Sequence, residues 1–272
     1  LLFAAGAIGE VNNMSCQAAN IIEYIHTATL LHDDVVDNAD LRRSKKSART
    51  IWGNEASVLV GDYLFTVSFK YLAAFKNLRM VEELSKATTL MARGEILQLT
   101  RSNDSATEED YLEIVYHKTA SLMGAAMALG VISAKGTEEQ QQAFYDCGKH
   151  IGMAFQLIDD ALDYDLDNQS LGKQQGADLK ERKITLPLSH LLKTASETDR
   201  EIVLDILDED EITDAHVLCV GKLVQKYGSA EYTKKRAEDY INQAKKDLTL
   251  VPQNEYRKSI DKLADFIVFR KQ

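Results

Sequence analysis

The chain has 272 residues, of which 45% are hydrophobic and only 2 are proline, so it is long enough for a sizeable core and poor in helix-breaking residues. Its formal net charge of −10 disfavours nucleic-acid binding, because phosphate backbones repel an acidic surface. The 3 cysteines, at positions 16, 147 and 219, match no metal-binding spacing and favour a reducing compartment.

The first half of the chain predicts long helices with short breaks between them. The opening residues Leu1 to Ala5 lack the basic region of a secretory signal and look like the interior of a helix, so we expect further natural sequence before them. The next helical face carries apolar residues at Ile21, Ile25, Ala28, Leu31 and Val35. Breaks are expected at 76–77 and 101–107.

The second half continues this pattern. Thr107 and Thr137 each stand three residues before an acid or amide, which is typical of a capped helix start. The uncharged stretch 119–134 reaches only ~24 Å as a helix, too short for a ~30 Å bilayer core, so it predicts a buried helix. A further apolar stripe carries Phe144, Cys147, Ile151, Phe155, Ile158 and Leu162.

The remaining stretches complete the prediction of the fold. Breaks are expected at 135–137, 167–176 and 251–252, and the acidic residues 197–214 are expected to form a solvated surface. No long window alternates like a strand, and no linker is long enough to separate domains. We therefore predict an all-α helical bundle that forms one domain over residues 1–272.

An aspartate cluster ends each of the two apolar stripes. Asp33, Asp34 and Asp37 lie three and four residues apart, on roughly one side of a helix, and Asp159, Asp160 and Asp163 repeat this spacing. Like charges at the edge of a core need protons or a cation, and Mg²⁺ commonly bridges carboxylates to substrate phosphates. An exposed helix face explains one such cluster equally well, but two on apolar stripes favour a metal site.

Basic residues follow both clusters in an otherwise acidic chain. Arg42, Arg43, Lys45, Lys46 and Arg49 follow the first, and Lys173, Lys180, Arg182 and Lys183 follow the second. A solvated face is the usual explanation of such runs, yet beside two metal motifs they favour an anion site. Metals with guanidinium and ammonium groups are what a diphosphate requires. Lys118 and Thr119 add a further cation and hydroxyl.

Together these motifs resemble the trans-isoprenyl diphosphate synthase family, in particular its medium- and long-chain, octaprenyl-type branch. The resemblance is carried by residues 26–37, 41–43 and 53–62 and covers nearly the whole chain. It implies an isoprenoid-synthase-type bundle around a central active-site cavity, and a homodimer. It also implies that isopentenyl diphosphate condenses with farnesyl or geranylgeranyl diphosphate to a long, octaprenyl-like all-trans product for isoprenoid quinone side chains.

The resemblance assigns roles by position. It implies two or three Mg²⁺ per active site, held by Asp33, Asp34, Asp37, Asp159, Asp160 and Asp163. It implies substrate binding by His26, Arg42, Arg43, Lys118, Thr119, Gln156, Lys173 and Lys183. The candidate catalytic residues are Asp33, Asp34, Asp37, Lys118, Asp159, Asp160, Lys173 and Lys183. Catalysis of this kind rests on positioning and on electrostatic stabilisation of the departing diphosphate.

Product length is expected to depend on residues near the first cluster. Ala28 and Thr29 are small where short-chain members carry bulky aromatics, so we expect a longer product, and Ala28→Phe is expected to shorten it. Met123 and Met127 are candidate residues for the floor of the cavity, although a plain core role suits flexible methionine equally well.

The sequence departs from the family pattern in its loops. The Gly-Gly-Lys-x-x-Arg segment is expected before Leu1, and residues 44–47 and 172–174 differ from the usual Gly-Lys-Pro-Thr and Gly-Lys-Pro, while their lysines remain. We therefore expect altered loops rather than lost chemistry.

Three alternatives stay open. They are a class I terpene cyclase, a catalytically silent partner subunit of a heteromeric prenyl diphosphate synthase, and a helical scaffold with no small-molecule site. We expect no transmembrane segment, a peripheral membrane contact for product release, and a cytoplasmic location, or the mitochondrial matrix in a eukaryote.

Overall fold

A computed structural model describes residues 1–42, 45–100, 107–165, 176–249 and 251–270. The helices of the first half are α1 (Leu2–Ile8), α2 (Asn13–Val36), α3 (Ala48–Trp52), α4 (Asn54–Ala74), α5 (Leu78–Thr100), α6 (Glu108–Val115), the π-helix η2 (Tyr116–Ala120) and α7 (Ser121–Ser133). Those of the second half are α8 (Glu138–Asp163), α9 (Ala177–Lys180), α10 (Leu186–Thr194), α11 (Glu197–Asp208), α12 (Asp214–Lys226), α13 (Ser229–Asp247) and α14 (Glu255–Phe269).

The predicted all-α fold is confirmed, with one small addition. Within the described residues the only strands are β1 (Leu41–Arg42) and β2 (Lys45–Lys46), an antiparallel pair in which Leu41 opposes Lys46. The alternation test missed it because two residues per strand are too few to show a period. The predicted caps at Thr107 and Thr137 are both present as reciprocal capping boxes.

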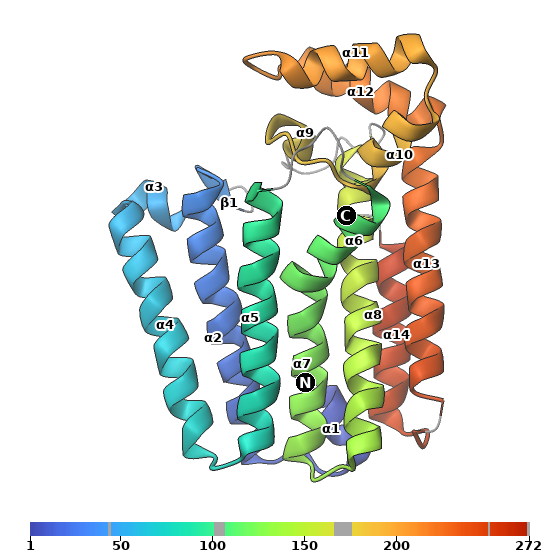
Figure 1. The fold of residues 1–272 in the computed structure, drawn as a ribbon. Coiled ribbons are helices and arrows are strands. Elements are labelled where there is room, and N and C mark those ends of the chain that lie inside the picture. The colour runs from blue at the N-terminus through green and yellow to red at the C-terminus, as the bar shows by residue number, and fades with distance from the viewer. Residues whose placement is uncertain (43–44, 101–106, 166–175, 250, 271–272) are drawn as a thin grey trace.

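The long helices stand side by side and both aspartate motifs lie at one end of them. In Figure 1, α2, α4, α5, α7, α8, α13 and α14 run roughly along one direction, with α2 packed on α4, and α8 on α7 and α13. The motifs occupy the C-terminal ends of α2 and α8, at the end where α11 and α12 cross the bundle. The fold therefore brings together two motifs that are far apart in sequence.

Close packing of α8 on η2 and α7 depends on two glycines. A Cβ at Gly152 would lie 2.6 Å from the Cα of Ala120, and one at Gly148 would lie 2.6 Å from the carbonyl oxygen of Met123. Because no side chain separates these backbones, residues one turn further along α8 can reach η2 directly.

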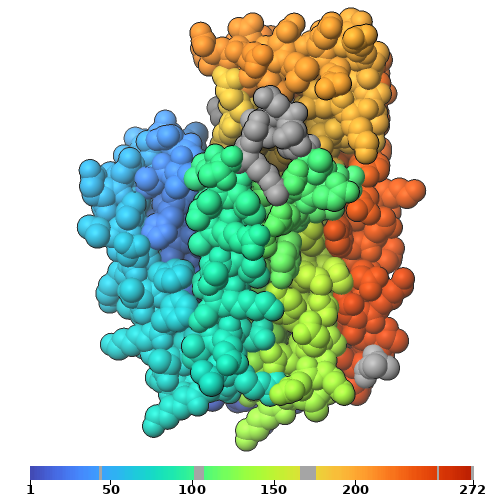
Figure 2. All heavy atoms as spheres, viewed as in Figure 1, coloured from blue at the N-terminus to red at the C-terminus, as the bar shows by residue number. Residues whose placement is uncertain are grey.

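The buried apolar residues form three clusters. The largest joins α6, α7, α8, α13 and α14, and another joins α2, α5 and α7 beneath the aspartate motifs. The third joins Tyr164 and Leu179 to residues 184–230, called the end lobe below, which rises beyond the α2–α5 group in Figure 2. Here the expected solvated surface of 197–214 is only partly right, because Val203 and Ile206 of α11 are buried in the end lobe.

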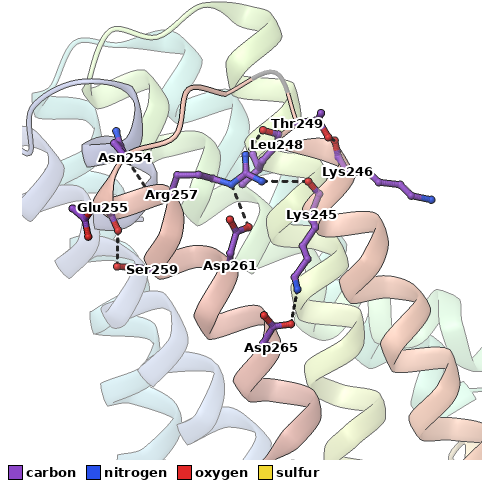
Figure 3. A network of polar contacts seen from close by, with 10 residues as sticks. All are labelled: Lys245, Lys246, Leu248, Thr249, Asn254, Glu255, Arg257, Ser259, Asp261 and Asp265. Atoms are coloured by element: carbon purple, nitrogen blue, oxygen red, sulfur yellow. Dashed lines mark hydrogen bonds and ion pairs between the residues drawn. The ribbon is translucent and has the colours of Figure 1, made fainter.

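The last helix is fastened to its neighbour at the turn that precedes it (Figure 3). The buried Arg257 donates to the carbonyl oxygens of Leu248 and Lys245 and, through Nε, to Asp261 over 3.2 Å. These bonds satisfy carbonyls that the end of α13 leaves without helical partners. They fix the direction of α14, which carries Arg270 to the second aspartate motif.

Candidate active site

A cavity of about 1050 Å³ lies between α2, α5, α6, η2, α7 and α8, and residues 178–185 close one side of it. Its polar end is lined by Asp33, Asp37, Arg42, Lys118, Thr119, Gln156, Asp159, Asp160 and Lys183. Its other end is lined by apolar side chains of α2, α5 and α7, among them Ile22, Met91, Leu122, Met123 and Ala126. Ligand pockets typically span roughly 300–1,000 Å³, so this cavity suits a large ligand with one charged end.

The three aspartates of the first motif do not all face the cavity. Asp33 and Asp37 line it, whereas Asp34 is buried, does not line it, and accepts a 2.8 Å hydrogen bond from Nε of Arg42. Burial raises the pKa of Asp33 to about 6, with Lys118 opposing and Glu95 and Asp37 adding to the rise. Burial thus makes the charged form of Asp33 costly, and a bound cation would stabilise that form.

The second motif is held by protein donors. Asp160 is 4% exposed, and its two oxygens accept hydrogen bonds from the Tyr111 hydroxyl at 2.5 Å and from Nε2 of Gln156 at 2.8 Å. Burial and the charges of Asp159 and Asp163 raise the pKa of Asp160 to about 7. The hydrogen bonds from Tyr111 and Gln156 lower this pKa, but by less. Its charge is thus costly while no cation is near.

Asp159 and Asp163 have different surroundings. Asp159 lines the cavity and forms an ion pair with Arg270, whose guanidinium also lies 4.3 Å over the Phe155 ring. Asp163 does not line the cavity; its carboxylate accepts hydrogen bonds from the backbone N–H groups of Ala177 and Asp178, at 3.3 and 3.1 Å.

Lys118 and Thr119 are both turned into the cavity by η2. A π-helical turn changes the direction of successive side chains and is frequent at functional sites. Nζ of Lys118 lies 2.5 Å from a carboxylate oxygen of Glu95 and 3.0 Å from the amide oxygen of Gln98. Thr119 donates to the amide oxygen of Gln156 over 3.1 Å, which the close packing of α8 on η2 allows.

Lys183 reaches the first motif from the segment that follows α9. Its Nζ lies 3.1 Å from Asp37 of the first motif and 2.6 Å from Glu181. Burial lowers the pKa of Lys183, but Glu181 and Asp37 outweigh it and raise the pKa above its ordinary value. The side chain is therefore a permanent cation at the polar end.

Several other predicted residues are placed by the structure. Thr29 and Met123 line the cavity, whereas Ala28 is fully buried and Met127 is 9% exposed, and neither of these two is part of the lining. His26 of α2 is exposed and lines the cavity. Arg43 and Lys173 lie outside the described residues.

Sequence reasoning missed two residues that the fold places at the site. Tyr111 holds Asp160 and Glu95 holds Lys118, but neither belongs to a sequence motif that marks a site. Only the packing of α6 on α8, and of α5 on η2, brings them into contact.

The donor chemistry of the polar end fits Mg²⁺. Among the described residues, no three side chains of His, Cys, Asp or Glu are grouped closely enough to hold an ion by themselves. Mg²⁺, however, usually keeps several waters and binds one or two carboxylates together with substrate phosphates. Asp33, Asp37 and Asp159 offer such carboxylates around one cavity.

None of the helices in the described ranges has the length and apolar character of a membrane span.

Known proteins resemble the chain over nearly its whole length. The family model "Polyprenyl synthetase" matches residues 1–223. Octaprenyl diphosphate synthase of Escherichia coli is 40% identical over 99% of this chain and 83% of its own, and all-trans-nonaprenyl-diphosphate synthase of Rhodobacter capsulatus is 37% identical over 100% and 83%.

The solved structures agree with these relatives. A polyprenyl synthase from Caulobacter crescentus, complexed with calcium and isoprenyl diphosphate, is 40% identical with a TM-score of 0.94, covering 99% of this chain and 83% of its own. A decaprenyl diphosphate synthase from Rhodobacter capsulatus is 39% identical with a TM-score of 0.92, covering 98% and 82%. The chain therefore belongs to the polyprenyl synthetase family and is a trans-prenyltransferase.

Proposed function

We propose that the chain uses Mg²⁺ to join isopentenyl diphosphate to farnesyl or geranylgeranyl diphosphate and builds a long, octaprenyl-like all-trans product for isoprenoid quinones. The observation that carries this proposal is a single cavity with two aspartate motifs and the cations Arg42, Lys118 and Lys183 at one end and an apolar lining at the other. An allylic diphosphate has the same division into a charged head and a hydrocarbon tail.

The polar end would hold the diphosphate of the allylic substrate. Asp33, Asp37, Asp159 and Asp160, which line the cavity, would hold two or three Mg²⁺, with Asp34 and Asp163 fixing the motifs that carry them. Bound Mg²⁺ supplies positive charge that stabilises the negative charge developing on a departing diphosphate.

The cations of the chain act on the same group. Lys118 and Lys183 would donate hydrogen bonds to the diphosphate oxygens, with Arg42, Thr119 and Gln156 beside them. Fixed donors aimed at developing charge lower a barrier because they need no reorganisation at the moment of reaction. Arg43 and Lys173 keep their proposed roles and lie outside the described residues.

The condensation needs a second substrate in line with the first. We propose that His26 and Arg43 help to hold isopentenyl diphosphate. The carbon–oxygen bond to diphosphate breaks first and leaves an allylic cation. The double bond of isopentenyl diphosphate attacks this cation to form the new carbon–carbon bond, and the departing diphosphate takes the proton whose loss restores a double bond. The apolar lining excludes water from the allylic cation.

The depth of the cavity bears on product length. From Asp33 to Ile22 the lining of α2 spans 11 residues (33 − 22), which is ~17 Å of helix. An isoprene unit adds four bonds to the chain. With the length per bond of an extended peptide chain, this amounts to on the order of 5 Å. The cavity as described thus holds about three units below Asp33, and an octaprenyl chain must pass between Ile22, Met91 and Ala126 as it grows.

We also propose that the chain forms a homodimer through α4. This helix exposes large apolar side chains, among them Leu59 at 67%, Tyr63 at 66% and Tyr71 at 51%, next to Trp52 of α3 at 70%. Such a contiguous exposed surface usually marks a protein interface. Sedimentation velocity should give a dimer for the unaltered chain and a monomer for Leu59→Glu.

Location and domain organisation are proposed on other grounds. The three cysteines are free, and the relatives named above are bacterial, which favours the cytoplasm. The continuous contacts between helices of both halves favour one domain over residues 1–272.

One experiment tests the proposed activity. The chain is incubated with labelled isopentenyl diphosphate and farnesyl diphosphate, with Mg²⁺ or with EDTA. Long polyprenyl diphosphates are expected only with Mg²⁺. No product beyond the primer would contradict the proposal, and product formed only after a second protein is added would favour the silent-subunit alternative.

A further inference from the structure

A buried tyrosine of α6 contacts the second aspartate motif from outside its own helix. Tyr111 is 6% exposed, and its hydroxyl donates to Oδ2 of Asp160, while Gln156 donates to Oδ1. Both oxygens of Asp160 are therefore engaged by protein donors. One donor lies a turn away on α8 and the other comes from a different helix.

The position of the Tyr111 hydroxyl is set by tertiary contacts. Glu108, three residues earlier on α6, accepts hydrogen bonds from the Tyr232 hydroxyl at 2.7 Å and from Nε of Arg236 at 2.9 Å, both on α13. The Tyr232 ring stacks on His190 of α10 with 4.2 Å between centroids. α6 is thus anchored at the turn that carries Tyr111, and the hydroxyl can act as a fixed point for Asp160.

Asp160 in turn orients groups at the polar end of the cavity. It immediately follows Asp159, and its hydrogen bond to Gln156 leaves the amide oxygen of that residue to accept from Thr119. A carboxylate that loses one of two buried donors must turn toward another donor or take up a proton. Either change alters the negative charge beside Asp159 and the direction of the Gln156 amide.

We infer that Tyr111 is a positioning residue for the reaction, which sets the affinity of the site for Mg²⁺ and diphosphate by holding Asp160. This inference rests on the proposed function. Residues that hold a metal site from behind typically change metal affinity about 10–100-fold when they are altered. Tyr111 itself lines the cavity, and in this scheme it acts through Asp160 rather than on the metal or the reacting carbons.

The test is Tyr111→Phe, which removes the hydroxyl and keeps the ring. Calorimetric titration of inorganic diphosphate in the presence of Mg²⁺ is expected to give about 10–100-fold weaker binding. The Mg²⁺ concentration for half-maximal turnover should rise in parallel, while kcat at saturating Mg²⁺ falls much less. A residue that only supports the fold would not produce this division between affinity and kcat.

The matched control is Tyr145→Phe. Tyr145 is also buried, and its hydroxyl is hydrogen-bonded to the hydroxyl of Tyr116 at 3.1 Å, but it does not line the cavity. Removing this hydroxyl should leave diphosphate binding unchanged. Glu108→Gln, which loosens the anchor of α6, is a second variant expected to weaken binding in the same direction but less. If Tyr111→Phe and Glu108→Gln both bind diphosphate as Tyr145→Phe does, the inference is overturned. If the unaltered chain binds diphosphate equally well with and without Mg²⁺, the proposed function fails instead.

Discussion

Adding a ring at two depths of the cavity should shorten the product by different amounts. Thr29 lies four residues before Asp33, or ~6 Å along α2, and Ala126 lies eight residues after Lys118, or ~12 Å along η2 and α7. At on the order of 5 Å per isoprene unit, a phenylalanine at position 29 leaves room for about one unit below the carboxylates. A phenylalanine at position 126 leaves room for about two. We expect the longest product from the unaltered chain and the shortest from Thr29→Phe.

The assay uses labelled isopentenyl diphosphate with dimethylallyl diphosphate, a primer of one isoprene unit, followed by chromatography of the products by chain length. Thr27→Phe is the control, because Thr27 is exposed on the same helix and does not line the cavity. Ala28→Phe is a poorer probe, because Ala28 is fully buried and an overpacked core costs about 1–3 kcal/mol. If Thr29→Phe and Thr27→Phe give the same product lengths, the placement of the growing chain along α2 is wrong.

Two further predictions concern the polar end. Gly94→Ala would bring a Cβ to 2.7 Å from Cβ of His117 and 2.9 Å from Cγ of Lys118, so we expect a fall in kcat/KM of about tenfold or more at nearly unchanged far-ultraviolet circular dichroism, measured in steady state. The pKa of Asp160 is raised to about 7 in the folded chain, against an ordinary value of 3.8. Its favourable contribution to folding stability is therefore fully present below about pH 4 and is lost as the pH rises through about 7. Urea unfolding in EDTA should therefore show the unaltered chain losing stability relative to Asp160→Asn over this range, and parallel profiles would contradict the assignment.

The sequence pattern predicts the helices and the paired motifs well, because both depend on local spacing. The caps at Thr107 and Thr137 are confirmed, and so is the helical spacing that brings Ile21 and Ile25 into the core. Spacing cannot tell which of two adjacent aspartates faces the cavity. Asp34 is turned ~100° from Asp33 about the helix axis, and Arg42 engages it there.

Contacts between helices were beyond prediction for a related reason. Residues 197–214 look like a surface because acids outnumber apolar residues, yet Val203 and Ile206 lie three apart and suffice to bury one face of α11. Tyr111 and Glu95 contact residues of other helices that are distant in sequence, and the sequence pattern alone gives no sign of such pairs.

The contact between Lys183 and Asp37 leads to a prediction with effects of opposite sign. Lys183 stays charged, and without a ligand it offsets the charge of Asp37 across the cavity. Lys183→Met removes this competitor, so Mg²⁺ alone should bind more tightly and raise the unfolding temperature at lower Mg²⁺ concentrations. The same variant lacks a donor for the diphosphate, so diphosphate should bind more weakly in saturating Mg²⁺. Lys180→Met is the matched control, because Lys180 pairs with the exposed Asp214 and does not line the cavity. A loss of affinity for both ligands would mean that Lys183 only supports the fold, whereas opposite changes would mean that substrate binding exchanges one set of counter-ions for another.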